Sequence, residues 1–186
     1  MGWVQYMNIF FSSDFHLGHF NIIEYCNRPF LTLNDMDSFI IGNCNARVKE
    51  DDLLIHNGDF CFKYSSEAPD SKKNAFEYYR NQLNCKNIIF LKGNHDGNRN
   101  GTKTIIDGMS ISHGGERIWI THNPAHARPD FKINLVGHVH NNWKIKSLND
   151  YSTMVNIGVD VWHFEPLTIN EILYEYNTWK IKKESP

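Results

Sequence analysis

Short apolar runs alternate with polar stretches along most of the chain. Seven of these runs have the length and the branched or aromatic residues of β-strands. They span residues 8–12, 53–56, 87–91, 109–112, 118–121, 133–136 and 154–161. Several are apolar at successive positions, as strands buried on both faces are. The pattern therefore predicts sheets that are covered by other layers.

Helical spacing separates the early strands and follows the last one. Apolar residues recur every three or four positions over residues 36–48 and again over residues 75–83, where Ser71 is a possible cap. Thr168 and Glu171 form a capping-box pattern ahead of a C-terminal helix. Early strands alternate with helices, whereas later strands follow one another as in hairpins. This mixture predicts an α/β sandwich with mixed sheets rather than a purely parallel, doubly wound fold.

Length and composition are those of one globular domain. The chain has 186 residues, of which 41% are hydrophobic and 22% charged, and no repeat or linker divides residues 1–186. A formal net charge of −2 gives no strongly basic character, so we expect no strong binding to duplex nucleic acid. The basic residues at 180–183 are interpreted as a solvated helix end.

The cysteines and the apolar runs bear on the cellular location of the protein. Four cysteines are scattered without a CxxC pair, which favours a reducing environment. The N-terminus lacks the basic region and apolar core of a signal peptide, and no run approaches the roughly 20 apolar residues of a membrane helix. We therefore expect a cytoplasmic protein without a membrane-spanning segment.

Potential metal ligands follow five of the predicted strands. Ten histidines occur, most of them near the edges of apolar runs, which raises the expectation of metal chemistry. The residues that follow the five strands, in chain order, are Asp14 and His16, then Asp59, then Asn94, His95 and Asp96, then His122, and last His138 and His140.

Spacing and residue type support this interpretation. Residues i and i+2 of an extended chain point to one side, so Asp14 can reach the same point as His16, and His138 the same point as His140. Glycines at positions 58, 93 and 137 allow sharp turns beside a crowded site. Carboxylates, imidazoles and an amide without thiolate suit manganese, iron, zinc or nickel. Seven such ligands are too many for one tetrahedral ion and fit two ions that share a carboxylate.

The five blocks D-x-H, G-D, G-N-H-D, T-H-x-P and G-H-x-H, in this order over positions 14–140, resemble the calcineurin-like metallophosphoesterases. The rest of the chain looks like the small stand-alone members of bacteria and phages. The resemblance implies a four-layer α/β/β/α sandwich with two mixed β-sheets. It also implies two divalent transition-metal ions, foremost manganese, with iron, zinc, nickel or cobalt as alternatives. The implied reaction is hydrolysis of phosphate mono- or diesters by a metal-bridging hydroxide.

The resemblance assigns roles residue by residue. The first ion would be held by Asp14, His16, Asp59 and His140. The second would be held by Asp59, Asn94, His122 and His138, with Asp59 bridging. His95 matches the family's non-ligand histidine, which assists the leaving group, and Asp96 would orient it.

Residues beside the blocks have two interpretations each. His19 and Arg28 either contact the phosphate or cap the turn that follows the first block. His126 and Asn123 either line the substrate pocket or are structural. Asp160 either supports a metal ligand from behind or ends a strand. The remaining histidines are interpreted as structural, at positions 56, 113 and 163.

Two alternative functions are compatible with the same expected fold. One is a nuclease or a phosphodiesterase that processes nucleotide ends. The other is a non-catalytic scaffold, like the retromer subunit that resembles the family; the full ligand set favours an enzyme over it. The substrate is expected to be a phosphate-ester small molecule or a nucleotide. The sequence leaves open monoester or diester specificity, the native metals and the oligomeric state.

Overall fold

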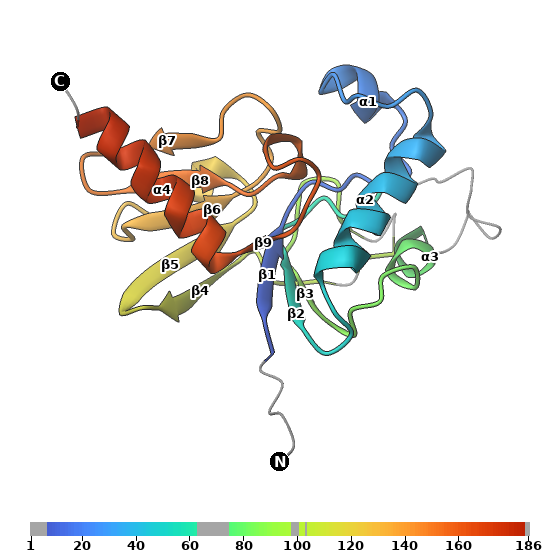
Figure 1. Ribbon diagram of the computed structural model, residues 1–186, viewed down its shortest axis with the longest axis horizontal. Helices are drawn as coiled ribbons and strands as arrows, with labels where there is room; N and C mark the ends of the chain where they lie inside the picture. The colour runs from blue at the N-terminus through green and yellow to red at the C-terminus, as the bar shows by residue number, and fades with distance from the viewer. Residues whose placement is uncertain (1–6, 63–74, 98–100, 103, 185–186) are drawn as a thin grey trace, which may run out of the picture.

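Two β-sheets form the centre of the protein, which is described by a computed structural model over residues 7–62, 75–97, 101–102 and 104–184 (Figure 1). The first sheet has the strand order β3 (Asn87–Phe90), β2 (Leu53–His56), β1 (Ile9–Ser12) and β9 (Leu167–Thr168). The second has the order β4 (Gly108–His113), β5 (Glu116–Thr121), β6 (Ile133–Val136), β8 (Thr153–Asn156) and β7 (Ile145–Ser147).

Both sheets are mixed, which confirms the prediction. In the first sheet β1, β2 and β3 are parallel, and β9 runs antiparallel to β1. In the second sheet β5, β6 and β8 are parallel, with antiparallel β4 and β7 at the edges. The hairpin-like succession expected of the later strands occurs at β4–β5, but the expectation is wrong for β5 and β6. These two strands are parallel, and the crossover between them includes the 3₁₀ helix η1 (Pro124–His126).

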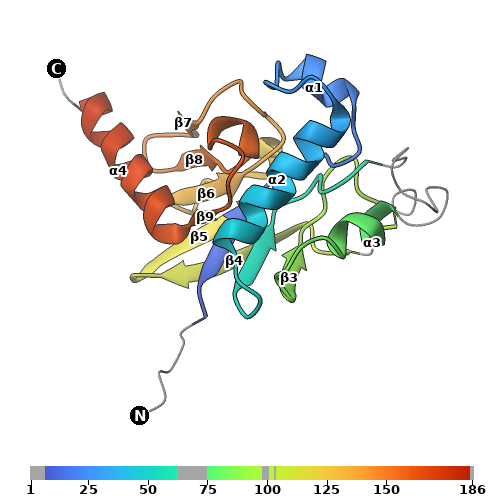
Figure 2. The ribbon, with the colours of Figure 1, turned by 45° about the vertical axis from the view of Figure 1, so that its right-hand side comes forward.

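Helices cover the sheets on two sides. Helices α2 (Leu33–Arg47) and α3 (Ala75–Arg80) lie beside the first sheet, and α4 (Ile169–Glu184) lies beside the second (Figures 1 and 2). One apolar cluster joins Phe10 of β1 to α2 and α3, whereas Phe11 belongs to a second cluster shared with the second sheet and α4. Because successive residues of a strand face opposite sides, β1 separates the two clusters. The protein thus has the predicted α/β fold of two mixed sheets with flanking helices.

Some predicted boundaries shift. The run 154–161 is a strand only to Asn156, and 3₁₀ helix η2 (Val159–Val161) follows it. The short helix α1 (Asn21–Tyr25) and the short strands β7 and β9 were not predicted. Ser71 lies outside the described residues.

The C-terminal helix begins with the predicted capping box. The backbone N–H of Thr168 donates to Glu171 Oε2 at 2.8 Å, and the N–H of Glu171 donates to Thr168 Oγ1 at 3.3 Å. Arg47 of α2 also pairs with Glu171, at 2.6 Å, so the cap ties α4 to α2.

All four cysteines are buried, and none forms a disulfide within the described part of the chain. None of the helices in the described ranges has both the length and the apolar character that crossing a membrane requires. The cytoplasmic location remains a prediction.

Candidate metal centre

The five motif blocks meet because their strands run the same way. The carboxyl ends of β1, β2 and β3 lie at one edge of the first sheet, and those of β5 and β6 at one edge of the second. Asn57 joins the two edges: its Nδ2 donates to the carbonyl of Thr121 at 2.9 Å, and its carbonyl accepts from Ser13 Oγ at 2.8 Å. The blocks are therefore fixed relative to one another across the two sheets.

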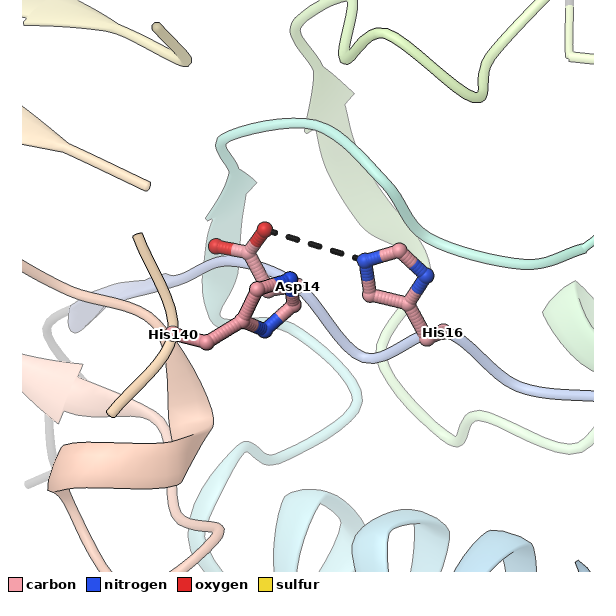
Figure 3. A group of neighbouring side chains, drawn as sticks. All are labelled: Asp14, His16 and His140. Atoms are coloured by element: carbon pink, nitrogen blue, oxygen red, sulfur yellow. Dashed lines mark ion pairs between the residues drawn. The ribbon is translucent and has the colours of Figure 1, made fainter. Parts of the chain in front are cut away.

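The first group of ligands consists of Asp14, His16 and His140. One potential ligand atom from each lies within 4.8 Å of the other two. Figure 3 shows Asp14 and His16 on the segment after β1, with His140 arriving from another part of the chain. The dashed line joins Asp14 Oδ1 to His16 Nε2, which are 3.9 Å apart. This group matches the predicted first metal position.

The second group consists of Asp59, His122 and His138, again with ligand atoms within 4.8 Å of one another. Asn94 lies against it: its Oδ1 is 3.0 Å from His122 Nε2 and 2.7 Å from His138 Nδ1. The structure thus brings together all seven residues that the sequence predicts as metal ligands, and their assignment to two metal ions stays a prediction.

Asp59 lies between the two groups. Its Oδ2 is 3.4 Å from Nε2 of His16 in the first group and 3.2 Å from Nε2 of His122 in the second. Its Oδ1 accepts from the backbone N–H of His95 at 2.8 Å, which holds the carboxylate in this orientation. This is the position that a bridging ligand needs.

The backbone at the ligands is left-handed. The φ angles are positive at five of the seven predicted ligands, namely Asp14 (59°), His16 (52°), Asp59 (54°), His138 (70°) and His140 (49°). The expectation of extended i, i+2 pairs is therefore wrong, because these residues come after the strands have ended and turn out of the strand direction. Left-handed backbone at non-glycine residues costs energy, and it persists where the surrounding structure imposes it, commonly at functional sites.

Two glycines allow backbone and carboxylate to approach closely. A Cβ at Gly93 would lie 2.1 Å from Asp59 Oδ1, and one at Gly137 would lie 2.6 Å from Asp14 Oδ2. Neither glycine has a positive φ, so their role here is close approach rather than the predicted sharp turn. Any larger residue would displace a carboxylate of the site.

The donor set fits divalent cations. Asp14 and Asp59 are fully buried carboxylates, and buried charge requires compensation. His16 Nε2 is also buried, yet among the described residues it meets no well-directed hydrogen-bond partner. Four imidazoles, two carboxylates and one amide oxygen form the set that borderline and hard divalent ions bind. The residues therefore satisfy what a metal centre demands, with a buried nitrogen left available to ligate.

Protons compensate the carboxylates in the metal-free site. Burial opposes protonation of His122, but Asp14 and Asp59 outweigh it and raise the pKa of His122 to about 9. Burial likewise opposes protonation of His140, whose hydrogen bond to Asp160 raises its pKa to about 10. Despite its burial, which would raise it, the pKa of Asp59 is lowered because the adjacent imidazoles of His122 and His16 stabilise its charged form. Metal ions and protons therefore compete for the same nitrogens.

We predict that metal affinity rises with pH up to about 9–10. The pKa values of His122 and His140 lie above the ordinary 6.5, so at pH 7 each holds a proton that a metal ion must displace. Affinity is weakened below these pKa values and levels off above them. Calorimetric titration with Mn²⁺ in buffers of different ionisation enthalpy should show net proton release at pH 7 and less at pH 9.5. A release that does not change with pH would contradict this.

His95 and Asp96 occupy the turn after β3. His95 is exposed, and one of its ring nitrogens lies within 4.8 Å of ligand atoms of His16 and Asp59. Asp96 Oδ2 accepts from the backbone N–H of Asp59 at 2.7 Å and of Gly93 at 2.9 Å. Asp96 thus fixes the backbone of the bridging residue, a contact that was not predicted. The leaving-group role of His95, and its orientation by Asp96, stay predictions.

Arg28 is buried, and its contacts favour the structural one of its two interpretations. Its Nε and Nη2 donate to Asp160 at 2.8 and 3.0 Å, and its Nη1 and Nη2 donate to the carbonyls of Phe15 and Asp14 at 2.9 and 2.8 Å. Nη1 also lies 3.4 Å from the sulfur of Met36. These partners occupy the five N–H groups of a guanidinium, so the geometry does not favour a phosphate contact.

His19 is also buried, with its Nδ1 3.2 Å from Nδ1 of His16. His126 is exposed and, with Asn123, lines a cavity of about 440 Å³ next to Asn94 and His122. Lys92 lines the same cavity. This position agrees with the pocket-lining interpretation of His126 and Asn123, although contact with a substrate stays a prediction.

Two asparagines support the site and were not predicted. The carbonyl of Asn57 accepts from Nδ1 of His122 at 2.8 Å. Asn156 Nδ2 donates to the carbonyl of His140 at 2.7 Å, and its Oδ1 accepts from the N–H of Gly158 at 2.8 Å. Both asparagines directly follow or end an apolar strand shortly before a glycine, and this pattern is the signal that could have identified them.

Comparison with known proteins gives the following matches. No protein-family model matches the chain. An uncharacterized protein of Methanocaldococcus jannaschii is 29% identical over 174 residues, covering 89% of each chain. A crystal structure of a protein of unknown function from Aquifex aeolicus superposes with a TM-score of 0.66 at 22% identity, covering 90% of this chain and 98% of that one. That structure shares the fold.

Two other solved structures match at lower similarity. One is a phosphoesterase from E. coli, with a TM-score of 0.42 and 14% identity over 81% of this chain and 78% of that one. The other is Vps29 of Entamoeba histolytica complexed with zinc, with a TM-score of 0.42 and 16% identity over 82% of this chain and 74% of that one.

Proposed function

We propose that the protein is a binuclear, metal-dependent phosphoesterase of the calcineurin-like class. The observation that carries the proposal is the position of Asp59, one oxygen of which lies 3.4 Å from His16 in one ligand group and 3.2 Å from His122 in the other. A carboxylate shared by two groups of imidazole and carboxylate donors is the arrangement of a two-metal site. The order of the five motif blocks supports the same class.

Two divalent ions, bound at these groups, would activate water and neutralise the charge of a phosphate ester. Asp14, His16 and His140 would hold the first ion, with Asp59 shared. Asn94, His122 and His138 would complete the second. Asn94 contributes a neutral oxygen, so the second position keeps more positive charge for the anionic substrate than a carboxylate there would leave.

Asp14 is a ligand rather than a nucleophile in this proposal. Both of its oxygens accept from the backbone N–H of His138, at 3.1 and 3.0 Å, and it is fully buried. A carboxylate held in this way can ligate a metal ion, but a substrate phosphorus has no room to approach it. The proposed reaction therefore proceeds by direct attack of water, without a phosphorylated enzyme.

The substrate would enter from the exposed side of the site. His95 and Asn94 are exposed there, and the cavity lined by Lys92, Asn123 and His126 opens beside the second ligand group. Lys92 supplies a positive charge and Asn123 and His126 supply polar groups, which suits a phosphate ester or a nucleotide. His95 would protonate the leaving group from the position that its backbone contact to Asp59 fixes.

The proposal predicts two metal ions per chain and hydrolysis by the loaded protein. Metal-free protein reconstituted with Mn²⁺ should approach two equivalents by elemental analysis. It should then hydrolyse at least one member of a panel of aryl phosphate monoesters, aryl phosphate diesters and 2′,3′-cyclic nucleotides, and Zn²⁺, Co²⁺, Ni²⁺ and Fe²⁺ should be compared.

Asp130→Asn is the matched control, because Asp130 is an exposed aspartate paired with Arg128, outside both ligand groups. This variant should bind and hydrolyse like the unaltered protein. Full activity at one equivalent of metal would remove the binuclear part of the proposal. Two bound ions without hydrolysis of any ester would favour the non-catalytic scaffold.

A further inference from the structure

The histidines of the first ligand group have side-chain partners from outside the motif blocks. His16 Nδ1 lies 3.2 Å from His19 Nδ1, and His140 Nδ1 lies 2.9 Å from Asp160 Oδ2. In the second group, by contrast, the Nδ1 atom of His122 meets a backbone carbonyl. Since the partner of the second ring nitrogen fixes the tautomer of a ligating histidine, these contacts bear on metal binding.

Metal ligation by His16 would select one of the two proton arrangements that its contact with His19 allows. Two ring nitrogens at hydrogen-bond distance share one proton, so one donates and the other accepts. The other nitrogen of His16, Nε2, faces Asp59 Oδ2 at 3.4 Å and Asp14 Oδ1 at 3.9 Å, where the metal ligands converge. If Nε2 of neutral His16 ligates an ion, its proton is on Nδ1, and His19 Nδ1 must accept it.

The ring of His19 is held with Nδ1 facing Nδ1 of His16. Its ring stacks on Phe62 with centroids 4.0 Å apart and an interplanar angle of 8°. Its backbone N–H donates to the carbonyl of His16 at 3.0 Å, and only 8% of the residue is exposed. An acceptor fixed in this way costs little further entropy when the hydrogen bond forms.

Asp160 is fixed in a comparable manner. Arg28 binds both of its oxygens, at 2.8 and 3.0 Å, and also donates to the carbonyl of Asp14 at 2.8 Å. The Arg28 and Asp160 side chains are 0% and 2% exposed, respectively. One buried arginine therefore connects the partner of His140 with the backbone of Asp14, another ligand of the same group.

We propose that His19 is a positioning residue, which accepts from Nδ1–H of His16 and thereby directs Nε2 of His16 to the first metal ion. Asp160, held by Arg28, does the same for His140. At the first metal position, side chains outside the motif blocks therefore orient the ligating histidines. The inference rests on the metal centre of the proposed function, not on its reaction. It assigns to His19 and Arg28 a task other than phosphate contact.

The test compares His19→Phe with His19→Asn by titrating metal-free protein with Co²⁺, followed by calorimetry and by visible absorption. Phenylalanine retains a ring to stack on Phe62 but cannot accept a hydrogen bond. The Oδ1 atom of asparagine can take the place of His19 Nδ1. We expect His19→Phe to lower the affinity of one of the two positions about 10–100-fold, the usual effect of losing such a partner. His19→Asn should recover most of this loss.

The same substitutions in an Asn94→Ala background identify the position that is affected. Because Asn94 belongs to the second group, the remaining tight position there is the first, and His19→Phe should weaken it. Equal affinities in His19→Phe and the unaltered protein, or a loss confined to the second position, would overturn the inference.

Nitrogen-15 NMR of the unaltered protein loaded with Zn²⁺ gives an independent measurement that needs no variant to fold. We expect the proton of His16 on Nδ1 and that of His19 on Nε2; a proton on His19 Nδ1 would refute the arrangement. None of these readouts requires hydrolysis. If the metal-binding pattern appears but no ester is cleaved, the phosphoesterase proposal fails and the positioning role stands.

Discussion

Replacing Asp59 with asparagine should remove tight binding at both metal positions and lower hydrolysis about 10³-fold or more, because transition-state stabilisation of several kcal/mol depends on the ions. Asparagine has nearly the shape of aspartate, and its oxygen can still accept from the N–H of His95. It cannot place a negative oxygen between His16 and His122, as Asp59 Oδ2 does at 3.4 and 3.2 Å. One substitution should therefore affect both ligand groups.

Elemental analysis and calorimetry with Mn²⁺ measure the effect of Asp59→Asn, and Asn94→Ala gives the comparison. Among the described residues, Asn94 Oδ1 lies against His122 and His138, both of the second group, so the loss of Asn94 should weaken that position and spare the first. Retention of two tightly bound ions by Asp59→Asn would show that this carboxylate does not bridge. The unfolding transition should be recorded for each variant, so that misfolding is not mistaken for lost ligation.

Replacing His95 with asparagine should slow the hydrolysis of esters with poorly acidic leaving groups about 10²–10⁴-fold, the usual range for general acid catalysis. A nitrophenyl leaving group departs with little protonation, so its loss should be clearly smaller. Rates across a series of leaving groups measure the difference, and metal content should stay near that of the unaltered protein. His113→Asn is a matched control, because His113 is an exposed histidine at the end of β4.

The two other outcomes for His95 are informative. Equal losses across the series would mean that the imidazole acts on the phosphoryl oxygens and not on the leaving group. Loss of a metal ion would mean that His95 is itself a ligand. Its ring nitrogen lies within 4.8 Å of ligand atoms of His16 and Asp59, so such a ligand would belong to the same centre.

The sequence predicts that the candidate ligands lie close together because of the way parallel strands end. Each motif block follows a short apolar run, and the carboxyl ends of parallel strands meet at one edge, so the blocks gather without knowledge of the loops. The strands that sequence reasoning missed, β7 and β9, have three and two residues, too few to show a period. Their pairing depends on the neighbouring strands and not on their own residues.

The surroundings of the ligands were harder to predict for a physical reason. Arg28 and Asp160 are 132 positions apart, and no local pattern indicates that they form an ion pair. His19 follows the first block closely enough to have been noticed. Whether it faces a substrate or a neighbouring histidine depends on left-handed φ angles that spacing does not reveal. The candidate ligands were thus recognisable from local motifs, whereas the contacts of the surrounding residues depend on the tertiary structure.

The left-handed backbone at five of the predicted ligands lowers the stability of the fold. Left-handed backbone costs a residue with a Cβ roughly 1–2 kcal/mol, so five such residues amount to a large part of the 5–15 kcal/mol that stabilises an ordinary domain. Glycine would relieve much of that cost at Asp14 or His140 while removing a ligand. Substitutions chosen for stability alone would therefore tend to remove the predicted ligands.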